Sequence, residues 1–137
     1  MKNERVGRDR EKGSVIAEVG LTLPVLLFMM LGLVDLGRGI AAKAAIGSAA
    51  RAATRYASVR STRSSDPATV SKIATYLRDR IEGLDPEQVQ VSAEWSPSNT
   101  RGAKVQVNVS YNFAPIMPFI PVSSVQLTSS SESIISN

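Results

Sequence analysis

The chain has 137 residues and a formal net charge of +4, and it contains neither cysteine nor histidine. The missing cysteines exclude disulfides and thiolate nucleophiles, and the missing histidines remove the commonest general base and zinc ligand. A chain of this length holds one modest domain, and we expect no enzyme, no metal and no cofactor.

Residues 1–13 form a polar leader that carries five basic and three acidic side chains. No apolar periodicity runs through the leader, which predicts a disordered cytoplasmic segment. Its basic balance suits an anionic membrane face better than a nucleic acid, so no nucleic-acid partner is expected.

An apolar run from Ser14 to Val34 has a single charged residue, Glu18. At 1.5 Å per residue the run is about 31 Å long, which is the thickness of a bilayer core. The apolar region of a conventional cleaved signal peptide is shorter, about 7–15 residues. We therefore predict a single transmembrane helix over residues 14–36.

The lengths of the two flanking segments indicate the orientation of this span better than their charges do. Arg38, Lys43 and Arg51 lie beyond it, so the positive-inside bias of the leader is weak. The short leader favours a cytoplasmic N-terminus, with the longer C-terminal part on the outer side.

Pro24 lies inside the apolar run, four residues after Gly20. A proline cannot donate a hydrogen bond to the carbonyl one turn earlier, and its ring crowds that position. The sequence therefore predicts a local kink or a melted turn at Pro24.

Residues 37–60 are rich in alanine and predict a helical extension of the span. Small residues at a strict spacing of four form a ribbon on which another helix can pack closely. The simpler interpretation is that alanine merely favours the helix. The ribbon consists of Ala41, Ala45, Ala49, Ala53 and Ala57.

Residues 61–137 predict a small extracytoplasmic α+β domain. Asp66 and Pro67 are typical of a helix N-cap and first position, and apolar residues recur at helical spacing as far as Ile81. Alternating stretches over 89–94 and 105–113, and a weaker one over 122–135, predict about three antiparallel strands. The overall class is α+β, with the amphipathic helix packed on the sheet.

Gly13, Ser14 and Glu18 form one physical unit at the start of the span. If the chain is cut after Gly13, Ser14 gains an α-ammonium group one helical turn from the Glu18 carboxylate. Each charge is costly at the membrane edge, and pairing within or between chains offsets that cost. Alternatively, Glu18 snorkels to the headgroups and has no further role.

Asp35 and Arg38 lie three residues apart on one helix face, at the outer end of the span. Side chains at this spacing can form an ion pair. Such a pair either contributes little energy, as most exposed pairs do, or fixes the register between helices of neighbouring subunits.

These motifs resemble those of the TadE-like pseudopilins of the tight-adherence (type IVc) pilus system. The resemblance covers nearly the whole chain after residue 10, and its N-terminal half is the specific part. It is carried by Lys12-Gly13, Glu18, Leu23–Leu27, Gly32–Arg38, Ala49–Ala57 and Val107–Phe113 followed by Pro115 and Pro118.

The resemblance implies that a prepilin peptidase cuts between Gly13 and Ser14. The mature chain would then be a minor subunit that helps to initiate or cap the pilus. Its expected partners are the lipid bilayer, this peptidase, other pilin-like subunits and the assembly machinery. Its expected location is the bacterial inner membrane, with incorporation into a surface pilus left open.

A membrane-anchored binding module is the main alternative function. It needs an exposed aromatic or apolar patch, for which Trp95 and the segment Pro115–Pro121 with Phe119 are the candidates. Catalysis is the weakest interpretation, because Asp85 and Glu87 look like loop acids and the sequence has no phosphate-binding glycine loop.

Overall fold

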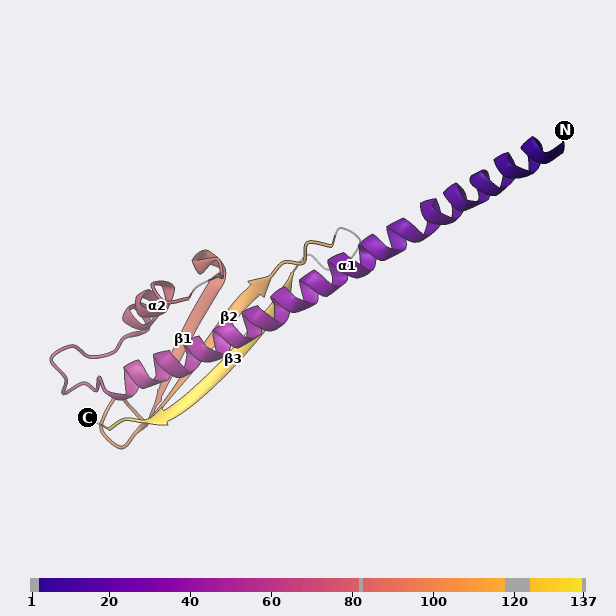
Figure 1. Cartoon of the computed structure of the whole chain (residues 1–137). Coiled ribbons are helices and arrows are strands. Elements are labelled where there is room, and N and C mark those ends of the chain that lie inside the picture. Colours follow the sequence, from indigo (N-terminus) through magenta and orange to yellow (C-terminus); the bar gives the residue numbers. More distant parts are fainter. Residues whose placement is uncertain (1–2, 82, 118–123, 137) are drawn as a thin grey trace.

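One long helix is followed by a short helix and a three-stranded sheet (Figure 1). The computed structural model describes residues 3–81, 83–117 and 124–136. The strand order is β1-β2-β3 and both neighbouring pairs are antiparallel, which confirms the expected α+β class. The elements are α1 (Asn3–Ser58), α2 (Val70–Arg78), the 3-10 turn η1 (Pro86–Gln88), β1 (Val89–Ser96), β2 (Lys104–Phe113) and β3 (Val125–Ile134).

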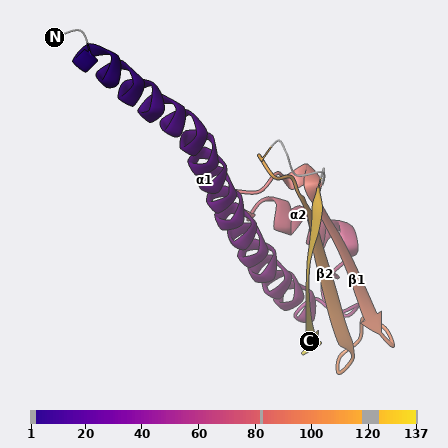
Figure 2. The same cartoon turned by 90° about the vertical axis from the view of Figure 1, so that its right-hand side faces the viewer.

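The helix α1 has a free half and a packed half. Its N-terminal half projects away from the sheet, whereas its C-terminal half lies along the strands (Figures 1 and 2). The packed half contacts both β2 and β3. Most side chains in the N-terminal half of α1 are therefore exposed in the described part of the chain.

One sequence prediction about α1 is wrong. Residues 3–13 are helical, not disordered, because extending an existing helix costs far less than nucleating one. Of the two outcomes predicted at Pro24, the melted turn does not occur, because the helix runs through the proline without a break, whereas the local kink stays a prediction. The proline removes one hydrogen bond to Gly20, which has no side chain to crowd the ring. The helix curves gently in Figure 2, and it ends at Ser58, just before the expected end at residue 60.

The core lies between α1 and the inner face of the sheet. Alternate residues of β2 are fully buried valines, and their partners in register on β3 are serines. These short side chains let the helix approach closely, so that Thr54 Oγ1 lies 2.8 Å from Ala50 O and 3.1 Å from Ser131 O of β3. The pairs are Val105–Ser133, Val107–Ser131 and Val109–Ser129.

The short helix α2 packs against α1 and β1 through Ile73 and Leu77, which are both buried. The contact of α2 with β1 confirms the prediction of an amphipathic helix packed on the sheet. The predicted start at Asp66 and Pro67 is wrong, because Thr69 is the N-cap and accepts a hydrogen bond from the backbone N–H of Lys72. The helix also ends at Arg78, before Ile81.

Asp66 has a different partner. Its carboxylate is hydrogen-bonded to the Lys72 ammonium group, which lowers the pKa of Asp66 below its ordinary value. Arg60 lies 3.8 Å from the same carboxylate. Asp66 therefore pairs with side chains around the first turn of α2 and does not cap it.

Substituting Thr69 with alanine should lower the free energy of unfolding by about 1 kcal/mol, because the first turn of α2 loses its side-chain acceptor. Asp66→Ala is the matched control and should have a smaller effect, since exposed ion pairs contribute little. Urea unfolding of the full chain in detergent micelles measures both. A larger loss for Asp66→Ala would contradict the helix start seen here.

The three strands lie close to their predicted positions. β1 extends two residues past the predicted end and includes Trp95, and β2 begins one residue early at Lys104. β3 begins at Val125; the predicted strand residues 122 and 123 lie outside the described residues, as does Phe119. Burial alternates along the whole of β1 and along the first six residues of β2, as the sequence alternation predicts.

Candidate membrane and assembly surface

The N-terminal half of α1 exposes its apolar side chains all round. Only 6% of its most apolar 18-residue window is buried within the chain. By length and composition this helix can cross a membrane. A core helix of a soluble domain would be largely buried, so the exposure indicates a surface made for lipid or for other helices. Exposed members include Leu21, Leu26, Met29, Met30 and Leu33.

The predicted processing residues lie near the free end of this helix. Ser14 and Glu18 are both exposed and lie one helical turn apart. The backbone oxygen of Glu18 accepts a hydrogen bond of 2.9 Å from the Thr22 hydroxyl. The side-chain carboxylate of Glu18 takes no part in this bond. Cleavage after Gly13 and pairing of Glu18 stay predictions.

Asp35 joins α1 to the segment that follows β2, a contact that sequence reasoning missed. Its carboxylate accepts hydrogen bonds from the backbone N–H groups of Ile116, at 2.9 Å, and Met117, at 2.8 Å. Arg38 Nη1 lies 2.9 Å from Asp35 Oδ1. The side chain of Asp35 is only 9% exposed, whereas that of Arg38 is 44% exposed. The carboxylate therefore holds a long-range contact as well as the local ion pair.

Two neighbours complete this junction. The Arg38 guanidinium lies over the Phe113 ring, 5.2 Å from its centroid, a distance suited to a cation–π interaction. The Met117 methyl group lies 3.0 Å from the position that a Cβ atom on Gly32 would take. The absence of a side chain at Gly32 thus lets the chain after β2 come close to α1.

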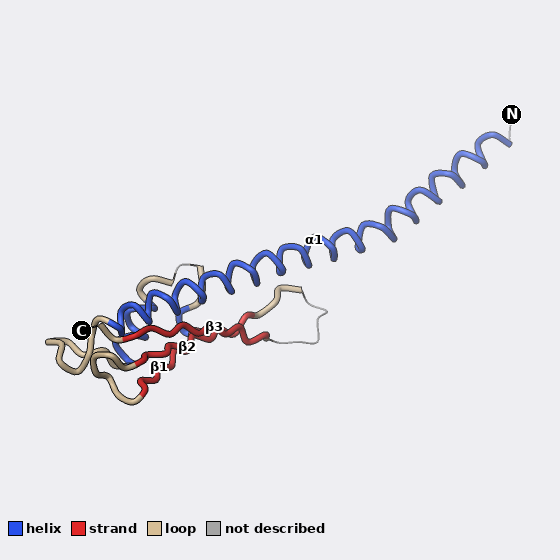
Figure 3. The backbone as a smooth tube through the Cα atoms, turned by 90° about the horizontal axis from the view of Figure 1, so that it is seen from below, coloured by secondary structure: helices blue, strands red, loops and turns tan. Residues whose placement is uncertain are grey.

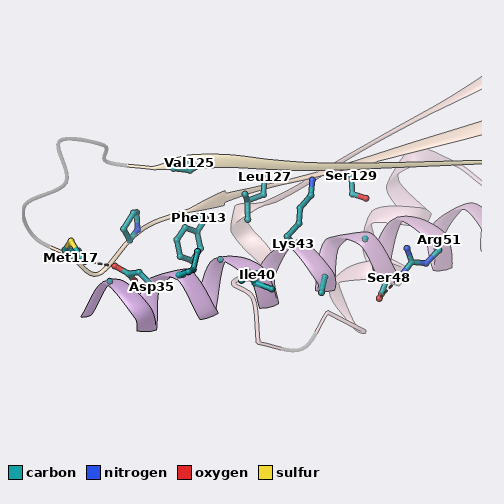
Figure 4. A pocket seen from close by; sticks show the side chains of 16 residues that line it. Asp35, Ile40, Lys43, Ser48, Arg51, Phe113, Met117, Val125, Leu127 and Ser129 are labelled. Atoms are coloured by element: carbon teal, nitrogen blue, oxygen red, sulfur yellow. Dashed lines mark hydrogen bonds between the residues drawn. The ribbon is translucent and has the colours of Figure 1, made fainter. Parts of the chain in front are cut away.

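A groove of about 870 Å³ lies between α1 and the strands β2 and β3 (Figure 4). Its walls include Leu36 and Ile40 of α1, Phe113 at the end of β2, and Leu127 of β3. Lys43 crosses one side and donates a hydrogen bond to the backbone oxygen of Thr128. The groove is mainly apolar and begins beside Asp35.

The alanine ribbon turns from the outside of the molecule into its core. Ala41 is exposed and Ala45 is half-buried, whereas Ala49 and Ala53 are buried against the chain's own sheet. The small side chains of the second pair are therefore used within this subunit. Packing of the ribbon against another subunit stays a prediction, for which Ala41 is the accessible member.

The arginines after residue 50 differ in their surroundings. Arg51 and Arg55 are exposed. Arg60 lies over the Tyr56 ring, 3.9 Å from its centroid. Arg60 therefore contributes to packing at the end of α1.

Two candidates of the alternative functions, Trp95 and Asp85, have structural surroundings. Trp95 is half-buried and packs against the core. It therefore offers less of its ring to a ligand than a tryptophan in an exposed loop would. Asp85 caps η1, with its carboxylate accepting a 3.0 Å hydrogen bond from the Glu87 N–H. Both observations favour structural roles for these side chains.

Comparison with family models finds a similarity on the helix. Residues 13–55 match the TadE-like protein family. The TadE-like match begins at Gly13, covers Glu18, Pro24 and the pair Asp35–Arg38, and ends at Arg55. It confirms the resemblance on the helix and does not extend to the sheet. The comparisons with curated proteins and with solved structures found no match.

The TadE-like segment thus coincides with the span-forming half of α1 and most of its packed half. This explains why sequence reasoning identified the helix features but missed the partners of Asp35. Ile116 and Met117 lie outside the matched segment, 81 and 82 residues further along the chain. The one available signal was an acid that ends an apolar run and needs compensation.

Proposed function

We propose that this chain is a membrane-anchored minor pilin-like subunit that acts in assembly or initiation of a tight-adherence pilus. The observation that carries the proposal is the TadE-like match on a helix of which only 6% of the most apolar 18-residue window is buried among the described residues. Other pilin-like subunits, the bilayer and the assembly machinery are the proposed partners. The proposed location is the bacterial inner membrane, with the sheet on the outer side.

Processing by a prepilin peptidase between Gly13 and Ser14 is part of this proposal. Cleavage would remove the polar leader and place a new ammonium group one turn from Glu18. Both groups lie on exposed helix surface, where an intersubunit or intrasubunit pair can form. Because an unpaired charge is expensive in hydrocarbon, this pair would favour one axial stagger between neighbouring helices.

The mature N-terminus tests the processing step. Mass spectrometry of the chain produced together with its peptidase should find a first residue of Ser14. A chain that keeps Met1 while pili form normally would contradict the proposed cleavage. The same measurement without the peptidase gives the uncut reference mass.

Glu18→Ala should leave the protein in the membrane fraction but lower the number of pili roughly tenfold or more, because the new amine loses its counter-charge. Thr22→Ala is the matched control, one turn away on the same exposed helix, and should assemble normally. Electron microscopy counts the pili. Normal piliation in Glu18→Ala would refute the charge-pairing role.

A further inference from the structure

Apolar side chains from three elements gather at the end of the sheet that faces the free half of α1. β2 ends and β3 begins at this end, beside the middle of α1 (Figures 1 and 3). Ile116, just after β2, is 56% exposed, and Val125, at the start of β3, is also exposed. Leu36 and Ile40 of α1 are exposed beside them.

The level of this end relative to the membrane follows from one contact. The Met117 methyl group approaches Gly32, which lies inside the apolar run 14–34. The chain after β2 therefore reaches back along α1 to the last turns of the span. If the run 14–34 fills the bilayer core, an exposed isoleucine at this height lies at the boundary between headgroups and acyl chains.

Non-helical backbone at this depth requires hydrogen-bond partners from the protein, because lipid supplies none. Asp35 supplies them, with one carboxylate oxygen for the N–H of Ile116 and the other for that of Met117. Arg38 lies at the same end with its side chain 44% exposed, where a guanidinium can reach the phosphate layer. The polar groups of the junction are thus arranged for a membrane interface.

We propose that the segment Ala114–Met117 is a second membrane contact, which rests in the interfacial layer of the bilayer and inserts Ile116 toward the acyl chains. This contact holds the sheet end-on above the membrane, with the β1–β2 turn at the far end. The inference rests on the proposed membrane span and adds a lipid partner for the domain that follows it.

The absence of native cysteine allows a direct test with single labels. Ile116→Cys, Val25→Cys and Ser98→Cys each receive the environment-sensitive fluorophore NBD, and the full chain is reconstituted in phosphatidylcholine–phosphatidylglycerol vesicles. Lipids with a nitroxide on the acyl chain serve as quenchers. Val25 lies within the span, and Ser98 is exposed in the turn between β1 and β2.

We expect strong quenching at Val25, clear quenching at Ile116 and little at Ser98. Quenching at Val25 but not at Ile116 would overturn the second contact and leave the span intact; this is also the result if another protein surface covers Ile116. Equal quenching at Ile116 and Ser98 would mean that the domain lies flat, which also overturns it. No quenching at Val25 would overturn the span itself, and with it this inference.

Discussion

Substituting Asp35 with alanine should release the segment after β2 from α1. The amide protons of Ile116 and Met117 lose both carboxylate acceptors, so we expect them to exchange with solvent at least about tenfold faster. Hydrogen exchange of the full chain in detergent micelles measures this directly. The N–H of Gly102, bonded to Ile135 O at the far end of the sheet, should keep its exchange rate.

Two further variants separate the contributions at this junction. Arg38→Gln removes the ion pair but leaves both carboxylate oxygens, so its effect on the same amides should be smaller than that of Asp35→Ala. Asp35→Asn keeps one acceptor oxygen and should fall between them. If Arg38→Gln matched Asp35→Ala, the local ion pair and not the backbone contact would hold the segment.

The parts of this fold that the sequence predicts depend on local periodicity. The alternation over 105–113 places Val105, Val107 and Val109 on one face of β2, and all three are fully buried. The helical spacing of Ile73 and Leu77 likewise identifies the buried face of α2. In both elements the pattern is set by burial on a single surface, so it is visible in a short window.

The parts that the sequence does not predict depend on distant partners or on competition between neighbours. Asp35 has a suitable local partner in Arg38, so nothing in its surroundings points to Ile116. Asp66 is as good an N-cap residue as Thr69, but distant partners hold the chain between them: the Ala68 N–H donates to Arg60 O, and Ala68 O accepts from Asn99 Nδ2. Local propensity leaves such choices open, and tertiary contacts decide them.

The TadE-like match and the fold divide the chain at different places. The match ends at Arg55, inside α1, whereas the core continues through β2 and β3. The buried alanines of α1 therefore face strands outside the matched segment. Their small size is a requirement of packing within the subunit, independently of any requirement from a neighbouring helix.

Ala53→Leu tests this packing requirement. Ala53 is fully buried between α1 and the sheet, and a leucine there adds three carbon atoms to a filled core. Such overpacking should lower the free energy of unfolding by about 1–3 kcal/mol. Alanine and leucine have similar helix propensities, so the loss would come from packing and not from the helix itself. Urea unfolding of the full chain in micelles measures it.

Ala41→Leu is the matched control, because it makes the same change on the same ribbon at an exposed position. Its free energy of unfolding should stay within about 0.5 kcal/mol of the unmodified chain. Equal losses at Ala41 and Ala53 would contradict the burial difference along α1. If Ala41→Leu folds normally but lowers the number of pili, the exposed end of the ribbon contacts another subunit, because folding alone cannot account for that defect.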